Sequence, residues 1–344
     1  MAHHYRAGSD AEGVTIETFL LKIVGLKPRA ALKRAFTARH IRLNGRVADR
    51  LQILHRNDTI EINDAASGLH TPAQATLLPN AQLALEILTQ TQEFIACAKA
   101  AGMNTHPLRP DDHTTVLNAL IARFPETARP CRLDKPLEGT LLHRLDRGTS
   151  GVLLAARDTA AFELLRQHWS SAKFEKVYLA WVNGYVTQGG RLELQLYHDP
   201  KSTKRMVAIE NSSEGRRAVT SFMPIKTVTL TNHEPVTLLL IRIHTGVMHQ
   251  IRATFKALGH PVLCDPIYLQ KTPTAAAGKF TLHRLDRDTD ALLQRLHARV
   301  APIGEPDPEA VPEQGFFLHA LWLRSPEVPG LEQGITAPIP RYFG

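Results

Sequence analysis

The sequence predicts an α/β protein built from a small N-terminal unit and a larger unit in which strands and helices alternate. Its 344 residues are 43% hydrophobic and 22% charged, the composition of a folded globular protein. That length predicts two domains, or one large domain with an appendage, because a domain takes roughly 150 residues. Apolar residues recur at helical spacing before residue 40, and strand-like and helix-like segments alternate from residue 81 to about residue 270.

The composition excludes disulfide scaffolds, collagen and wholesale disorder. Cys97, Cys131 and Cys264 lie far apart without CxxC spacing, so we expect small buried apolar side chains rather than a disulfide framework or a thiolate zinc site. The first ten residues contain no apolar stretch, and the most apolar run, residues 236–241, is too short to span a bilayer. We therefore expect a cytoplasmic protein without a signal peptide or a membrane segment.

Two helices and a hairpin are predicted near the N-terminus. Residues 16–23 place apolar side chains at helical spacing, and a second helix is predicted from Pro28, with one side basic. Asn44-Gly45 is the strongest short signal for a β-hairpin, and residues 59–62 alternate like a strand. The chain carries a net charge of +8, and residues 1–63 hold +5 of it, with eleven Lys and Arg against six Asp and Glu. A concentrated basic segment suggests a phosphate-bearing partner.

This order of helix, basic helix and Asn-Gly hairpin over residues 14–63 resembles the S4-type RNA-binding domain. The resemblance implies that the cations of the second helix and of the hairpin face RNA phosphates, namely Arg29, Lys33, Arg34 and Arg46. The alternative is an ordinary solvated helix face. Residues 64–80 are small and contain prolines, which predicts a linker, and residues 81–344 form the larger unit. Residues 271–314 are interpreted as an insertion, partly mobile, with a helical segment inside it.

A carboxylate between two arginines begins the most informative segment. Asp146 lies in a short glycine-containing loop between Arg144 and Arg147, directly before an apolar run that predicts a buried strand. Catalytic groups concentrate in loops that rigid strands hold. Flanking guanidinium groups would keep the carboxylate ionised, which suits a nucleophile or a general base. Taken alone, the segment is also compatible with a structural Arg–Asp pair in a turn.

Residues 143–151, His-Arg-Leu-Asp-Arg-Gly-Thr-Ser-Gly, resemble the signature of the RluA-type pseudouridine synthases, and further segments similar to that family follow in the family's order. They are residues 94–107, 176–184, 244–252, 258–268 and 317–320, so the resemblance spans roughly residues 85–330. It implies a mixed, largely antiparallel sheet and the isomerisation of uridine to pseudouridine in RNA without a cofactor or a metal. The scattered histidines agree with the absence of a metal, because no HExxH motif or Cys/His cluster is found among them.

The resemblance also assigns roles to individual residues. Asp146 would attack the sugar or deprotonate it, Tyr178 would stack on the extracted uracil and move a proton, and Arg252 would pair with the aspartate. Arg144 would fill the gap left by the flipped nucleotide. The other residues expected to bind RNA or substrate, or to support the loop, are His143, Lys176, His249 and Gln250.

Three positions depart from the family's pattern. Val247 stands where the family has an arginine, Ala100 where it has a proline, and Cys264 where it has a glycine. They suggest a divergent member, and a non-catalytic RNA-binding or ribosome-assembly protein is the rival hypothesis. Residues 283–286 repeat the tetrad His-Arg-Leu-Asp without its surrounding motif, which makes Asp286 the second candidate nucleophile. The expected partner is structured RNA, with ribosomal RNA favoured over transfer RNA, and a monomer is expected.

Overall fold

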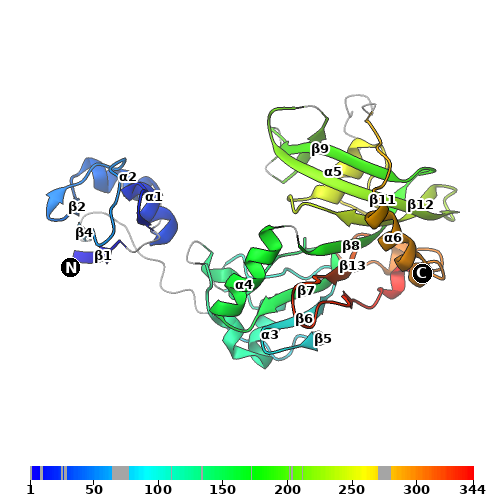
Figure 1. Cartoon of the computed structure of the whole chain (residues 1–344), viewed down its shortest axis with the longest axis horizontal. Helices are drawn as coiled ribbons and strands as arrows, with labels where there is room; N and C mark the ends of the chain where they lie inside the picture. Colours follow the sequence, from blue (N-terminus) through cyan, green and yellow to red (C-terminus); the bar gives the residue numbers. More distant parts are fainter. Residues whose placement is uncertain are drawn as a thin grey trace.

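The computed structural model contains two separate β-sheets. It describes residues 2–7, 11–24, 26, 29–63, 77–109, 111–132, 135–171, 173–200, 202, 204–210, 212–269 and 280–344. Figure 1 shows the small N-terminal sheet with its helices at one side, and the large sheet with the remaining helices at the other. The cavity described below belongs to the unit of the large sheet.

The small unit is a four-stranded sheet covered by two short helical segments. Its elements are β1 (Ala2–Arg6), α1 (Ile16–Thr18), the π-helix η2 (Phe19–Ile23), α2 (Arg29–Thr37), β2 (Ile41–Leu43), β3 (Arg46–Val47) and β4 (Thr59–Asn63), with the strands in the order β1-β4-β2-β3. Asn44 and Gly45 both have positive φ, +49° and +79°, as a tight two-residue hairpin turn requires. The predicted hairpin between β2 and β3 is therefore confirmed.

The small unit begins earlier than the sequence predicts. Residue 14 is the predicted start, but β1 pairs with β4 along its whole length. Ala7 and Ala11 are buried in the same apolar cluster as Ile16 and Leu32. The missed strand is only five residues long and three of the five are histidine or arginine, so it lacks the apolar alternation by which strands are recognised.

The large sheet has ten strands and is mixed but largely antiparallel, as the resemblance implies. Its order is β10-β9-β11-β12-β8-β13-β7-β6-β5, with β14 paired to β13, and the pairing of β13 with β7 is parallel while the other pairings are antiparallel. The strands are β5 (Glu86–Gln90), β6 (Phe94–Lys99), β7 (Ser150–Ala156), β8 (Glu175–Asn183), β9 (Gly190–His198), β10 (Met206–Ile209), β11 (Arg216–Thr229), β12 (Pro235–Ile243), β13 (Leu318–Arg324) and β14 (Ile335–Thr336).

Helices cover both faces of this sheet. They are α3 (Val116–Arg123), α4 (Thr159–Ser170), α5 (Gln250–Ala257) and α6 (Arg287–Val300), with short 3₁₀ turns at Pro125–Ala128, Pro136–Glu138, Pro308–Ala310 and Arg341–Phe343. Residues of β8 alternate between two cores, as the two-residue period of a strand requires. Leu179 and Trp181 pack in the cluster that includes α6, whereas Ala180 and Val182 pack in the cluster that includes α5. Tyr178 packs on the second of these faces.

The predicted linker is too long at its C-terminal end. Leu77 is buried in the cluster around α3, and the backbone amide of Asn80 donates to the carbonyl of Asn118 on that helix. Residues 77–80 therefore belong to the large unit, because their polar backbone and apolar side chains are both satisfied there. Residues 64–76 lie outside the described residues.

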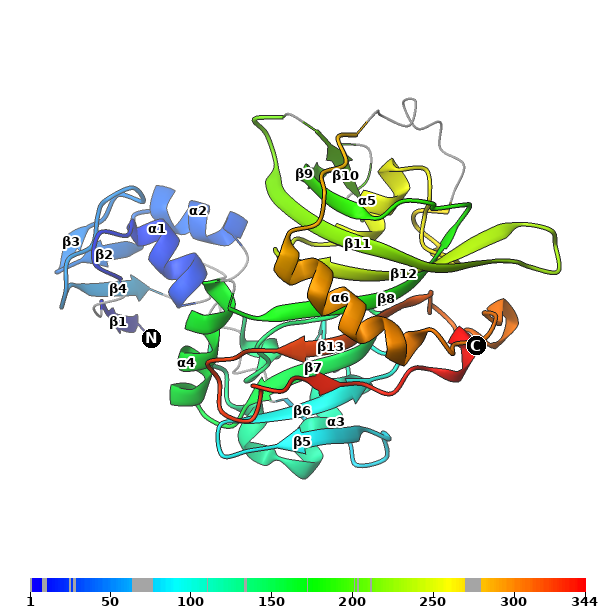
Figure 2. The same ribbon diagram turned by 45° about the vertical axis from the view of Figure 1, so that its right-hand side comes forward.

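The segment interpreted as a partly mobile insertion contains a packed helix. Residues 270–279 lie outside the described residues, but α6 crosses the large sheet beside β11 and β12 (Figure 2). Its buried side chains include Leu292, Leu293, Leu296 and Val300. The polar and proline-rich sequence around this helix is the ground for expecting mobility, but the apolar side chains of α6 pack against the sheet. In the part of the chain that the structure describes, no helix combines the length and apolarity needed to cross a membrane.

Truncating the buried stripe of α6 tests whether this helix stabilises the large unit. Leu293→Ala removes a fully buried side chain, so we expect the free energy of unfolding to fall by about 2–5 kcal/mol. Leu164→Ala on α4, at a side chain that is 45% exposed, is the matched control and should cost less than about 0.5 kcal/mol. The three tryptophans all lie in the large unit, so urea unfolding followed by tryptophan fluorescence reports on it selectively. Equal midpoints for the two variants would contradict the packing of α6.

Candidate active site

The loop that precedes β7 carries Asp146 and is fixed by side chains from the end of β6 and from the segment that follows it. Thr105 donates its hydroxyl to the carbonyl of Leu145 at 2.8 Å and accepts from the amide of the same residue at 3.2 Å. Lys99 donates from Nζ to the carbonyl of Arg147 at 2.9 Å. The backbone is therefore held on both sides of Asp146 by buried hydrogen-bonding groups, which leaves the carboxylate little freedom of position.

Two glycines of the same motif allow the loop to lie directly against the chain around β13. A Cβ atom at Gly148 would lie 2.3 Å from the ring of Phe316, and one at Gly151 would lie 2.2 Å from the carbonyl oxygen of Ala320. Gly151 also has a φ of +119°, which a residue with a side chain rarely adopts. Glycine at both positions is thus required by close backbone contact.

Arg252 links the carboxylate of Asp146 to a second, buried carboxylate. Its Nη1 donates to Oδ2 of Asp146 at 2.8 Å, while Nε and Nη2 donate to the two oxygens of Asp265 at 2.7 and 2.9 Å. The guanidinium also lies over the rings of Phe316 and Tyr268, 4.4 and 5.1 Å from their centroids. Burial disfavours the charged form, but the two carboxylates outweigh it and raise the pKa of Arg252. The guanidinium is therefore permanently charged and held in a single orientation.

Asp265 is a site residue that the sequence reasoning missed. Its side chain is fully buried, and it also accepts from the amides of Ile267 and Tyr268 at 3.0 and 3.2 Å. The residue before it, Cys264, has a φ of +62°, a conformation in which glycine carries no steric cost. The available signal was the family segment at residues 258–268, where a glycine is expected before this aspartate; its contact with Arg252 is visible only in the fold.

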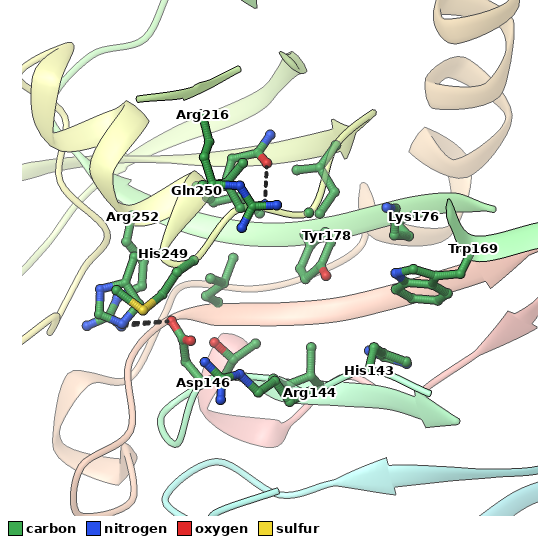
Figure 3. A pocket seen from close by; sticks show the side chains of 18 of the residues that line it. His143, Arg144, Asp146, Trp169, Lys176, Tyr178, Arg216, His249, Gln250 and Arg252 are labelled. Carbon is green, nitrogen blue, oxygen red and sulfur yellow. Dashed lines mark hydrogen bonds and ion pairs between the residues drawn. The ribbon is translucent and has the colours of Figure 1, made fainter. Parts of the chain in front are cut away.

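Arg147 does not flank the carboxylate as predicted. Its Nε donates to the carbonyl of Gly102 at 2.8 Å, so the side chain turns away from Asp146 and toward the segment after β6. The predicted pairing of Arg252 with Asp146 is confirmed as a contact, and Arg252 provides the charge expected from the neighbour in sequence. Arg144 is exposed and faces the same space as Asp146 (Figure 3).

A cavity of about 330 Å³ opens over Asp146. Figure 3 shows Tyr178 between Asp146 at one end and a group of His143, Trp169 and Lys176 at the other. Eight of the twelve site residues predicted from the sequence line this cavity: Asp146, Tyr178, Arg252, Arg144, His143, Lys176, His249 and Gln250.

Tyr178 presents its ring and hydroxyl to the middle of the cavity (Figure 3). Burial and the nearby charge of Asp146 both raise the pKa of its phenol, so the hydroxyl stays protonated near neutral pH. It is thus an aromatic surface with a hydrogen-bond donor at its tip, next to a carboxylate.

The far end of the cavity is built around Trp169. The ring of His143 stacks on it with centroids 4.5 Å apart, and Nζ of Lys176 lies 5.0 Å from the centroid of the same ring. Burial lowers the pKa of His143 to about 3, and its Nε2 accepts from the amide of Leu154 at 3.2 Å. His143 is therefore a neutral packing group. Burial lowers the pKa of the Lys176 amine to about 8, so its charge is lost in mildly alkaline solution.

Gln250 and His249 are engaged with the protein itself. The amide of Gln250 donates to the carbonyl and hydroxyl oxygens of Val219 and Thr220, both at 3.0 Å, and accepts from Thr245 at 2.8 Å. Of the two roles expected for Gln250, support of the loop or contact with RNA, these hydrogen bonds correspond to the first, because they tie β11 to the loop before α5. The Nδ1 of His249 lies 3.1 Å from the hydroxyl of Tyr268.

The four remaining predicted residues lie on the small unit and outside this cavity. Arg29 is 70% exposed, with Nε 3.6 Å from a carboxylate oxygen of Glu17, and the other three side chains, Lys33, Arg34 and Arg46, are exposed. The second candidate nucleophile, Asp286, caps α6 by accepting from the amide and the hydroxyl of Thr289, both at 2.8 Å. Among the described residues, no group of three His, Cys, Asp or Glu side chains could hold a metal ion.

Comparisons with known proteins find relatives for the part of the chain that contains this cavity. Residues 93–257 match the family described as RNA pseudouridylate synthase. An uncharacterized RNA pseudouridine synthase of Chloroflexus aurantiacus is 34% identical over 170 residues, which are 49% of this chain and 50% of the relative. A ribosomal large subunit pseudouridine synthase D of Nitrosomonas europaea is 31% identical over 215 residues, or 62% of this chain and 56% of the relative. The chain thus spans about half the length of these two curated relatives.

A longer alignment and a solved structure extend this likeness. A synthase of the same name from Escherichia coli K12 is 26% identical over 283 residues, covering 81% of this chain and 79% of the relative. The structure of human RNA pseudouridylate synthase domain containing 1 superposes with a TM-score of 0.51 at 20% identity, over 76% of this chain and 86% of that one, and agrees with the fold. These matches agree with the order of motifs in the sequence, and they show that residues 93–257 are similar to the RNA pseudouridylate synthase family.

Proposed function

We propose that this protein isomerises uridine to pseudouridine in RNA, with Asp146 as the carboxylate that acts on the ribose. The observation that supports this most strongly is the contact between Arg252 and Asp146, 2.8 Å long, at the floor of a cavity whose other charged side chains are cationic. The carboxylate suits reaction at a ribose, and the cationic side chains suit the phosphates of the RNA chain that carries it. The name of the Nitrosomonas relative, a ribosomal large subunit pseudouridine synthase, favours large-subunit ribosomal RNA as the substrate, with transfer RNA as the alternative.

The reaction breaks the bond between N1 of uracil and C1′ of ribose, and forms a bond between C5 and C1′ with loss of the C5 proton. Two roles fit a carboxylate in this position: addition to C1′, or removal of a proton from the sugar, while uracil departs as an anion. Both routes leave the atoms of the nucleotide in balance without an external reductant or oxidant. Oδ2 of Asp146 is occupied by Arg252, whereas Oδ1 accepts no hydrogen bond from any described residue and is available to the substrate.

Tyr178 supports the same reaction in two ways. Its ring offers an apolar face for the uracil once the nucleotide has left its stack, an exchange that costs a few kcal/mol. Its protonated hydroxyl can donate to the departing uracil and later relay the proton released from C5. Its place between Asp146 and the Lys176 end of the cavity suits both roles (Figure 3).

The small unit is proposed to dock structured RNA as an S4-type domain does. Its exposed cations on α2 and on the β2–β3 hairpin support this proposal. Counterion release would make that docking strongly dependent on salt.

Substitution of the nucleophile tests the reaction. Asp146→Asn should bind RNA within about twofold of the wild type, yet release of tritium from RNA labelled at uridine C5 should fall at least about a thousandfold, because an amide neither attacks nor deprotonates the sugar. Asp286→Asn is the matched control and should keep its activity, because asparagine caps helix α6 as well as aspartate does. A wild-type protein that binds RNA without releasing tritium would instead identify a non-catalytic RNA-binding protein.

The buried carboxylate should matter for stability as well as for turnover. Asp265→Asn leaves the buried guanidinium of Arg252 without half of its counter-charge, so the free energy of unfolding should fall by about 3 kcal/mol or more. The same change at Asp146, whose side chain is 29% exposed, should cost less than about 1 kcal/mol. Because Asp265 orients Arg252, the rate constant of the first variant should also fall by roughly a hundredfold. Urea unfolding and single-turnover assays measure the two effects, and equal stability losses would contradict the role of Asp265.

The amine of Lys176 predicts a pH dependence of RNA binding. Burial lowers its pKa to about 8, so the amine is charged below pH 8 and neutral above it. Affinity for RNA should therefore drop by roughly tenfold between pH 7 and pH 9, the loss of one charge-assisted contact worth about 1.5 kcal/mol. Lys176→Arg stays charged at both pH values, so its affinity for RNA should not drop between pH 7 and pH 9. Lys176→Met carries no charge and should bind RNA weakly at both pH values. Fluorescence anisotropy in the Asp146→Asn background measures the affinity for RNA without turnover. If Lys176→Arg lost affinity between pH 7 and pH 9 as the wild type does, the Lys176 amine would be excluded as the cause.

A further inference from the structure

An arginine on the rim of the cavity has no role in the family motifs described above. Arg216, the first residue of β11, is exposed and directs its guanidinium into the cavity from the wall formed by β11 and α5 (Figure 3). Arg144 faces the same space from the loop that precedes β7. The two guanidinium groups thus belong to opposite walls, with Asp146 and Tyr178 between them.

The backbone fixes the direction of this side chain. Gly215 has a φ of +97°, and a Cβ atom there would lie 2.8 Å from the carbonyl oxygen of Leu196, so the turn into β11 is tied closely to β9. The register pairs Arg216 with Leu196 and Arg217 with Gln195. Because neighbours on a strand point to opposite faces, only one of the two arginines can face the cavity.

The two neighbouring arginines differ in what they bind. Arg217 is held by Glu193, with Nη2 2.8 Å from Oε2. Arg216 makes no hydrogen bond, ion pair or ring contact with any residue that the structure describes. Among the other cations of the cavity, Arg252 is bound to two carboxylates and Lys176 lies over Trp169. Arg216 therefore presents a full set of guanidinium donors to whatever enters the cavity.

The ligand that fits an unpaired, solvent-facing guanidinium here is a phosphate. The carboxylate of Asp146 is the cavity's single acidic lining group among the described residues, and Arg252 already neutralises it. When a nucleotide leaves its stack, its base enters the pocket while its phosphates stay at the mouth, where Arg216 lies. A guanidinium matches two phosphate oxygens at once, which fixes orientation as well as position.

We propose that Arg216 binds a backbone phosphate of the RNA beside the target uridine and so positions the ribose over Asp146. This inference rests on the proposed function. Val247 lines the same cavity, at the position where the family motif has an arginine, and the loop before it is open, since a Cβ atom at Gly246 would meet no atom within 4 Å. The charge absent from residue 247 is thus supplied from the neighbouring strand by Arg216.

Four variants test this. Arg216→Ala should raise KM for RNA about tenfold with little change in kcat, and should reduce the slope of log Kd against log salt by about one unit. Arg217→Ala is the matched control and should change neither quantity. Arg216→Lys should recover part of the loss, because an ammonium group provides charge without the two-oxygen fit. Arg216→Ala combined with Val247→Arg should restore KM to within about threefold of the wild type.

The binding measurements are made in the Asp146→Asn background, so they do not depend on turnover. An active wild type in which Arg216→Ala behaves like Arg217→Ala would overturn the phosphate contact and leave the proposed function intact. A wild type that forms no pseudouridine would overturn the proposed function, and the salt slopes would still decide whether Arg216 binds a phosphate. If the double variant had the same KM as Arg216→Ala alone, an arginine at residue 247 would not replace Arg216, and the two positions would not serve the same phosphate contact.

Discussion

The contact of one guanidinium with two carboxylates organises this protein. Arg252 on α5 is almost fully buried and donates to Asp265 with two nitrogens and to Asp146 with the third. A buried charge is tolerated only when it is paired and its donors are satisfied, so α5, the segment that carries Asp265 and the loop before β7 must all be in place together. Asp146, which is only partly exposed, is consequently held at the floor of the cavity with one carboxylate oxygen free of contacts from the described residues.

The large sheet makes this contact possible. The loop before β7 and the start of α5 are about a hundred residues apart in the chain, and β8 and β13 lie between β7 and β12 in the sheet. The parallel pairing of β13 with β7 brings the chain around Phe316 against Gly148, where that ring also covers the guanidinium of Arg252. Packing and electrostatics therefore depend on the same few residues, and a change in either would displace the carboxylate.

The cationic side chains at and near the cavity differ in burial, and therefore in their charge state and in the partners that they bind. Arg252 is permanently charged and committed to carboxylates, and Lys99, whose pKa burial lowers to about 7 against the opposing effect of Asp146, ties down the loop backbone. Lys176 has a pKa of about 8, whereas Arg144 and Arg216 face solvent at the rim. A polyanion approaching the cavity thus meets exposed guanidinium groups first, while Arg252 and Lys99 hold the carboxylate and its loop.

The sequence by itself determined the motifs and what they require locally: the hairpin at Asn44, the strand that carries Tyr178, and the expectation that Arg252 meets Asp146. The first two follow from short-range rules, whereas the third is what the resemblance to the pseudouridine synthases implies. The tertiary structure alone decided which way the side chains turn. Arg147 turns to the carbonyl of Gly102, and α6 packs on the sheet instead of standing free. The contact of Asp265 with Arg252 and the direction of Arg216 into the cavity are likewise visible only in the fold. The physical reason is that the direction and charge state of a side chain are set by partners distant in sequence, which no local pattern of residues encodes.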